Sequence, residues 1–130
     1  MKTVKLFWID DMELWAKSAQ SNLKIIASKY ECELVIIPAV NGEDVDIAQK
    51  IMLYDFDAII MDFHMEPFNG DKYIRDIRFE DHLDHIPIIF YSQDNTTNLA
   101  ELVKELKNIT TVYRPFLEDK IKDLFLVKKK

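Results

Sequence analysis

Residues 56–70 read FDAIIMDFHMEPFNG and predict a strand that is followed at once by a carboxylate. The first part, 56–61, is a short and nearly continuous apolar run, which is typical of a strand covered on both faces in a parallel sheet. Asp62 stands where this strand is expected to end. The segment therefore predicts a buried strand that places an acidic side chain at one edge of a sheet.

The rest of the chain repeats this alternation of apolar and amphipathic segments. Four more short apolar runs lie at 3–9, 32–40, 86–91 and 109–113. Stretches with helical spacing lie at 15–30, 43–54, 71–83, 97–107 and 117–127. Regular β-α alternation requires right-handed crossovers, which place helices on both faces of the sheet. The sequence predicts a three-layer α/β/α fold, with a doubly wound, flavodoxin-like sheet of five parallel strands in the order 2-1-3-4-5.

Length and composition limit the possible classes of protein. The chain has 130 residues, so we expect 1–130 to form a single domain. A formal net charge of −6 disfavours direct nucleic-acid binding, because phosphate contacts need a basic surface. The apolar stretch 6–9 is too short for a secretory signal and no later run reaches membrane length. We expect a soluble, cytoplasmic protein without membrane contact, in which the single cysteine, Cys32, fills apolar space in or beside a strand.

Chemically useful side chains stand directly after the apolar runs: Asp10 and Asp11 after the first, Asp62 after the third, Ser92 after the fourth and Arg114 after the fifth. In a doubly wound fold the functional crevice lies beyond the carboxyl ends of the strands, so these residues are predicted to converge. Each has a plainer role when taken alone. Asp11 could cap a helix, Asp62 could serve a turn, Ser92 could be a loop hydroxyl and Arg114 a surface charge.

Three crowded carboxylates indicate a bound cation. They repel one another and raise each other's pKa values, and a hard divalent cation relieves that repulsion. Mg²⁺ takes oxygen ligands, keeps several waters and commonly uses one or two carboxylates together with a phosphate oxygen. The pattern therefore predicts a Mg²⁺ site with room for a phosphoryl group.

Over essentially its whole length the chain resembles the receiver domain of bacterial two-component response regulators. The matching pieces are the acidic pair at 10–11, AVNG at 39–42, the stretch 56–70, PIIFYS at 87–92 and RPF at 114–116. Met65 and Gly70 stand three and eight residues after Asp62, as in the phosphoacceptor motif of that family. An ordered set of motifs along the whole chain is more specific than any one acidic pair.

The resemblance implies a role for each of these residues. Asp62 is the nucleophile that forms an acyl phosphate. Mg²⁺ is bound directly by Asp11, Asp62 and the main-chain carbonyl of His64, while Asp10 acts largely through water. Ser92 donates its hydroxyl to a phosphoryl oxygen. No cofactor other than Mg²⁺ is implied, and no enzymatic activity beyond self-phosphorylation and autodephosphorylation.

Three further positions complete the implied site or depart from the family pattern. The backbone N–H of Gln93 helps to cradle the phosphoryl group. Arg114 stands where the family usually has lysine, and its planar fork can pair with phosphoryl oxygens bidentately. The peptide bond before Pro115 is implied to be cis and to aim Arg114 inward. Thr111 stands where many receivers have a rotating aromatic side chain.

The resemblance also implies partners. The phosphoryl donor is a phosphohistidine on a sensor histidine kinase or a phosphotransfer protein. Phosphorylation adds charge and strong acceptors, which would shift the surface made by 97–107, 109–113 and 117–127. That surface would bind a downstream effector protein or an output domain, or form a homodimer.

Other classes of function remain open from the sequence. One alternative is an atypical receiver that acts as an interaction module without phosphorylation, and its best support is Arg114 and Thr111. A Mg²⁺-dependent phosphohydrolase is disfavoured because the haloacid-dehalogenase signature, two aspartates separated by one residue, is missing at both Asp10 and Asp62. A flavin-binding flavodoxin is disfavoured because the acidic loop after the first strand would repel a phosphate.

Overall fold

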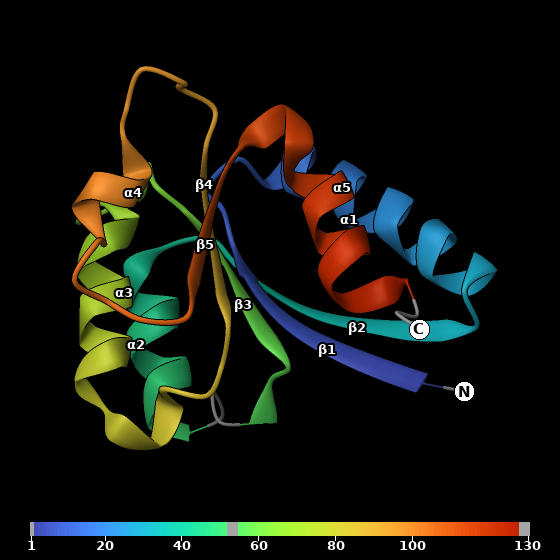
Figure 1. The fold of residues 1–130 in the computed structure, drawn as a ribbon, viewed down its shortest axis with the longest axis horizontal. Coiled ribbons are helices and arrows are strands. Elements are labelled where there is room, and N and C mark those ends of the chain that lie inside the picture. Colours follow the sequence, from blue (N-terminus) through green and yellow to red (C-terminus); the bar gives the residue numbers. More distant parts are fainter. Residues whose placement is uncertain (1, 52–54, 128–130) are drawn as a thin grey trace.

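A five-stranded parallel sheet forms the centre of the protein in the computed structural model, which describes residues 2–51 and 55–127 (Figure 1). The strands are β1 (Lys2–Ile9), β2 (Cys32–Ala39), β3 (Ala58–Asp62), β4 (Ile88–Ser92) and β5 (Ile109–Tyr113). Their order is β2-β1-β3-β4-β5 and every pairing is parallel, so the predicted topology is confirmed.

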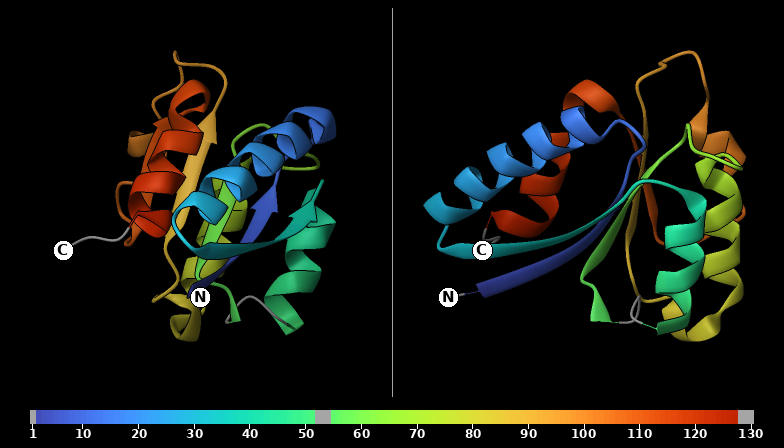
Figure 2. Two further views of the ribbon diagram at one scale, coloured as in Figure 1. Left: turned by 90° about the vertical axis from the view of Figure 1, so that its right-hand side faces the viewer. Right: turned by 180° about the vertical axis from the view of Figure 1, so that it is seen from behind.

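Two helical layers cover the sheet. The helices are α1 (Glu13–Lys29), α2 (Gly42–Ile51), α3 (Gly70–Phe79), α4 (Leu99–Leu102) and α5 (Leu117–Ile121). Helices α1 and α5 lie on one face, and α2, α3 and α4 on the other (Figures 1 and 2). Side chains of β1 alternate between the layers: Leu6 and Trp8 pack toward α1 and α5, whereas Phe7 and Ile9 pack toward the other three helices. None of the helices in 2–51 and 55–127 is long and apolar enough to cross a membrane.

The start of α2 is held by two side-chain hydrogen bonds. The Asn41 side chain accepts from the Asp44 N–H at 3.0 Å, and the Asp44 carboxylate accepts from the Val40 N–H at 3.1 Å. The predicted helix over 43–54 is found up to Ile51, and its last three positions, 52–54, lie outside the described residues. Cys32 is the first residue of β2 and is buried, as expected.

The predicted helix over 97–107 is wrong in its length, because α4 spans only Leu99–Leu102. After it the backbone turns instead of continuing, and Asn108 adopts a left-handed conformation with φ 61°. The Leu102 carbonyl, which a longer helix would pair with the Leu106 N–H, instead accepts a hydrogen bond from Arg75 of α3, and the Lys107 carbonyl accepts one from Arg78. Tertiary contacts therefore override the helical periodicity of this segment.

The two remaining predicted helices are present in modified form. The helix over 71–83 divides into α3 and a 3₁₀ turn, Asp81–Leu83, because Glu80 between them is extended. The helix over 117–127 is α5 followed directly by a π turn, Lys122–Leu126.

Candidate functional site

The carboxyl edge of the sheet gathers the predicted site residues. Asp62 and Ser92 are the last residues of β3 and β4, and Asp10 and Arg114 directly follow β1 and β5. One carboxylate oxygen from each of Asp10, Asp11 and Asp62 lies within 4.8 Å of the others. These three residues are called the acidic cluster below. Asp10 and Asp62 are buried, whereas Asp11 is exposed.

The Asp10 carboxylate is held by hydrogen bonds from Tyr91 and Met12, in addition to the one from Arg114 described below. Its Oδ2 accepts from the Tyr91 hydroxyl at 2.5 Å, and its Oδ1 accepts from the Met12 N–H at 2.7 Å. The Tyr91 oxygen in turn accepts from the indole N–H of Trp8 at 3.1 Å. The plainer reading of Asp11 as the helix cap is wrong, since Asp10 accepts the N–H at this turn and Met12 occupies the cap position of α1.

The surroundings of Asp62 disfavour the ionised form of its carboxyl. Burial raises the pKa of its carboxyl from 3.8 to about 8, helped by Asp10 and Asp11 and opposed by Arg114 and the backbone N–H of His64. Its Oδ1 is buried and has no hydrogen-bond partner among the described residues. A buried carboxylate oxygen without a donor, beside two more carboxylates, fits the oxygen ligand set that Mg²⁺ prefers.

Arg114 brings a cation to the acidic cluster. Its Nη2 lies 3.2 Å from Asp10 Oδ2 and 3.8 Å from Asp62 Oδ2, and its Nη1 donates to Gln93 Oε1 at 2.7 Å. The side chain is only 10% exposed, so these contacts are poorly screened by water.

The cis peptide bond implied before Pro115 is not found. Among the described residues the cis bond is Glu66–Pro67. A 3₁₀ turn begins at Arg114, and the fixed φ of a proline suits the first turn of a helix. Arg114 points inward without a cis bond because its guanidinium meets Asp10 and the ring of Trp15.

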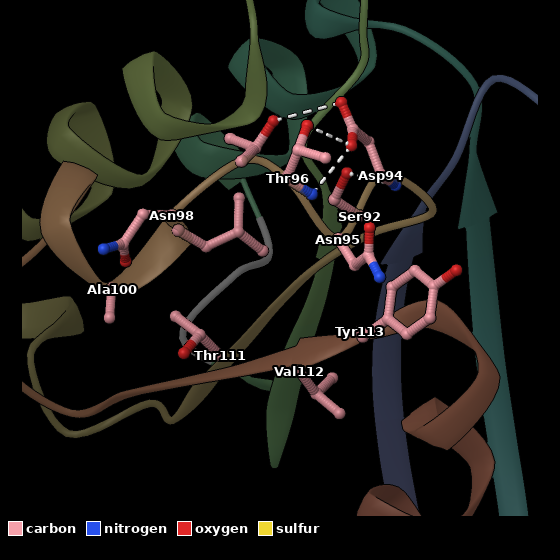
Figure 3. A pocket seen from close by; sticks show the side chains of 11 residues that line it. Ser92, Asp94, Asn95, Thr96, Asn98, Ala100, Thr111, Val112 and Tyr113 are labelled. Carbon is pink, nitrogen blue, oxygen red and sulfur yellow. Dashed lines mark hydrogen bonds between the residues drawn. The ribbon is translucent and has the colours of Figure 1, made fainter.

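Ser92 lies beside an open pocket of about 440 Å³ between β5 and the loop 93–98 (Figure 3). Its hydroxyl oxygen accepts from the Asp94 N–H at 3.0 Å, and the Asp94 carboxylate accepts from the Thr96 N–H at 2.8 Å. Thr111 lines this pocket and is half-buried. The Ser92 hydroxyl keeps its own proton available for a further acceptor.

The loop between β3 and α3 closes tightly on the site. The Gly70 N–H donates to the Phe63 carbonyl at 2.7 Å, and the Gly42 N–H donates to the Glu66 carbonyl at 2.8 Å. A Cβ on Gly70 would lie 2.1 Å from the Asp62 carbonyl oxygen, a distance that backbone atoms cannot accept. Steric contact with the Asp62 backbone therefore explains why a glycine stands eight residues after Asp62.

Gly70→Ala is expected to lower the free energy of unfolding by about 2–4 kcal/mol, because the new methyl group displaces the backbone at Asp62. Urea denaturation measures this change. The matched control is Asn69→Ala, since Asn69 is exposed and its side chain makes no capping hydrogen bond to α3. Equal midpoints for the two variants would show that the loop absorbs the methyl group.

Solved structures share this fold. The chemotaxis response regulator CheY4 of Vibrio cholerae superimposes with a TM-score of 0.72 at 19% identity, over 94% of this chain and 95% of that one. The signal receiver domain of a DNA-binding response regulator from Colwellia psychrerythraea gives 0.71 at 21% identity, over 93% and 97%.

A third structure contains a metal ion. The receiver domain of a sensor histidine kinase from Pseudomonas aeruginosa, with magnesium coordinated in its active-site cleft, gives a TM-score of 0.72 at 14% identity, over 94% of this chain and 93% of that one. No family model matches the sequence, and no curated protein matches it either. The structural matches show that the chain has the fold of response-regulator receiver domains.

Sequence reasoning missed the side chains that hold the site residues in place. Tyr91 lies within the apolar run 86–91 and Trp15 within the helical stretch 15–30, and neither pattern marks the residue as a contact of the site. Their partners, Asp10 and Arg114, are distant in the chain. No local pattern distinguishes a core aromatic residue from one that orients a charged group.

Proposed function

We propose that this protein is a phosphoacceptor receiver of a two-component pathway, in which Asp62 takes a phosphoryl group from a phosphohistidine with the help of Mg²⁺. The observation that carries the proposal is the acidic cluster itself. Three carboxylates meet within 4.8 Å at the carboxyl edge of a receiver fold, and the buried Asp62 Oδ1 has no donor among the described residues.

In this reaction an oxygen of Asp62 forms a bond to phosphorus while the bond between phosphorus and the donor nitrogen breaks. Asp10, Asp11, Asp62 and the main-chain carbonyl of His64 would hold Mg²⁺ directly or through water. When bound, the ion supplies positive charge that offsets the carboxylates and the transferring phosphoryl group. Burial disfavours the ionised form of Asp62, which is the form that attacks phosphorus. Positive charge at this site would therefore also favour ionisation of the nucleophile.

Two side chains are suited to receive the phosphoryl oxygens. The Ser92 hydroxyl already accepts from Asp94 and can donate its proton to a phosphoryl oxygen. Arg114 stands 3.8 Å from Asp62 with a fork that pairs with phosphoryl oxygens. The backbone N–H of Gln93 would complete the cradle. Movement of Ser92 would pull on the loop 93–98 through the Asp94 hydrogen bond.

The output would be a shift of the surface formed by α4, β5 and α5. A downstream effector protein, an output domain or a second copy of the chain would read it. We expect no turnover of other substrates, so the only reactions are phosphorylation and dephosphorylation of the protein itself.

Acetyl phosphate tests the proposal directly. With Mg²⁺ we expect the intact mass to rise by one phosphoryl group, and peptide mapping to locate it on Asp62; excess chelator should prevent the reaction. Fluorescence of Trp8 should respond to Mg²⁺, since its indole N–H reaches Asp10 through the Tyr91 hydroxyl. No modification together with no Mg²⁺-dependent change in fluorescence would rule the proposal out.

One observation favours a second candidate, an interaction module that works without phosphorylation. Arg114 already pairs with Asp10 and approaches Asp62, so the acidic cluster is partly neutralised without a metal ion. The same experiment separates the candidates, because this module would take up no phosphoryl group.

A further inference from the structure

The guanidinium of Arg114 lies over an aromatic ring. Its Cζ is 4.3 Å from the centroid of the Trp15 ring and 5.8 Å from that of Tyr91. A cation within about 6 Å of an indole face is attracted to it, and the attraction strengthens when water is excluded. Arg114 is only 10% exposed and Trp15 is half-buried, so this contact is largely shielded from solvent.

The Trp15 ring is itself held firmly. It contacts the rings of Trp8 at 6.5 Å and of Tyr91 at 6.0 Å between centroids. These aromatic residues come from α1, β1 and β4, and the hydrogen bonds from Trp8 to Tyr91 and from Tyr91 to Asp10 connect them to the acidic cluster. The ring under Arg114 is therefore part of a packed platform and has little freedom to move.

Hydrogen bonds alone do not account for the position of the Arg114 guanidinium. Nη1 donates to Gln93 and lies 3.2 Å from the Met12 sulfur, and Nη2 donates to Asp10. Nε is buried and has no hydrogen-bond partner among the described residues. A guanidinium whose donors are only partly satisfied gains from a ring that supports its flat face.

We propose that Trp15 is a positioning residue of the site, whose ring holds the Arg114 guanidinium beside Asp10 and Asp62. This inference rests on the proposed function, because the reaction that Arg114 assists is the phosphoryl transfer to Asp62. The pair suits an arginine at this position. A planar cation stacks on an indole, whereas an ammonium group on a flexible stem has less need of a ring.

A double-mutant cycle tests the pair, using Trp15→Leu, Arg114→Met and the double variant. The guanidinium repels a metal ion at the acidic cluster, so both single variants should bind Mg²⁺ more tightly in calorimetry. For Trp15→Leu we expect about a three- to thirtyfold change, together with slower modification by acetyl phosphate. In the Arg114→Met background, Trp15→Leu should change the Mg²⁺ affinity no further. Trp15→Phe keeps an aromatic ring, so its Mg²⁺ affinity should lie between those of the wild-type protein and Trp15→Leu.

The control is Leu14→Ala, since Leu14 precedes Trp15 on α1 and is 87% exposed. The inference is overturned if Trp15→Leu binds Mg²⁺ and reacts like this control, or if its effects persist undiminished without Arg114. A wild-type protein that binds Mg²⁺ but takes up no phosphoryl group would defeat the proposed function alone. If the wild-type protein binds no Mg²⁺, the same double-mutant cycle is measured by urea denaturation. A coupling energy of zero between Trp15 and Arg114 in the free energy of unfolding then overturns the inference.

Discussion

Replacing Asp62 with asparagine is expected to stabilise the metal-free protein and at the same time to abolish its modification by acetyl phosphate. The amide cannot form an acyl phosphate. It also removes the charge that burial penalises at this position, where the pKa of the carboxyl is raised to about 8. Near pH 8 we expect a gain on the order of a few kcal/mol in the free energy of unfolding, measured by urea denaturation with chelator present.

The pH dependence follows from the direction of the shift. The carboxyl of Asp62 has a pKa of about 8 in the folded protein and near 3.8 in the unfolded chain. Between these values the folded state binds more protons, so its stability falls as the pH rises. In Asp62→Asn this fall should be absent. Saturating Mg²⁺ should reduce the difference between the two proteins, because a bound cation balances the charge.

The matched control is Asp81→Asn, an exposed aspartate in the turn that precedes β4. It should leave both modification and the pH profile unchanged. A phosphoryl group found on Asp62→Asn would assign the acceptor to another side chain. A wild-type stability that rises between pH 4 and 8 would show that the ionised carboxylate of Asp62 is well accommodated.

Arg78→Met is expected to remove a large part of the stability of the fold. The Arg78 guanidinium is buried and donates to four carbonyl oxygens, those of Leu83 (3.0 Å), Ile86 (2.6 Å), Lys107 (2.8 Å) and Asn108 (3.1 Å). It thereby joins α3 to the segments that lead into β4 and β5. Methionine removes four hydrogen bonds from a charged donor, each worth about 1.5–3 kcal/mol. The Leu83 and Asn108 carbonyls still accept from the N–H groups of Ile86 and Ile88, whereas those of Ile86 and Lys107 lose the donor described above. We expect a loss of about 4 kcal/mol or more, against a usual total of about 5–15 kcal/mol.

The same helix provides the comparison. Arg75 lies one turn earlier and is 42% exposed on its side chain. It pairs with Asp71 at 2.7 Å and Glu105 at 3.5 Å, and it donates one exposed hydrogen bond to the Leu102 carbonyl. Arg75→Met should cost only about 1 kcal/mol, because its ion pairs and its hydrogen bond to Leu102 are all exposed to water. Arg78→Lys should fail to rescue stability, since one ammonium group cannot reach four carbonyls that surround a planar fork. Equal urea midpoints for Arg75→Met and Arg78→Met would contradict this reading.

Most of the fold could be predicted because its signals are local. Each strand is a short apolar run, and β-α alternation leaves few topologies once crossovers must be right-handed. The position of the acidic cluster follows from the same rule, since parallel strands end at one edge and Asp10, Asp11 and Asp62 come directly at or after those ends. Neither prediction depends on which side chains are in contact in the folded protein.

The errors arose where distant groups decide the local structure. The apolar spacing over 97–107 is helical, yet carbonyl oxygens of this segment bond to Arg75 and Arg78 of α3 and the helix stops at Leu102. The bond before Pro115 was judged from a resemblance, although the inward direction of Arg114 depends on Trp15 and Asp10.

The order of residues alone therefore determined a five-stranded receiver-like sheet and the edge at which its carboxylates meet. Only the tertiary structure decided what orients those carboxylates: Tyr91 donates to Asp10 from 81 positions away, and Trp15 supports Arg114 from the first helix. The physical reason is the separation along the chain of the residues that interact. Periodicity and strand ends are set by neighbouring residues, whereas a hydrogen bond or a stacked cation depends on two side chains that only the folded chain brings together.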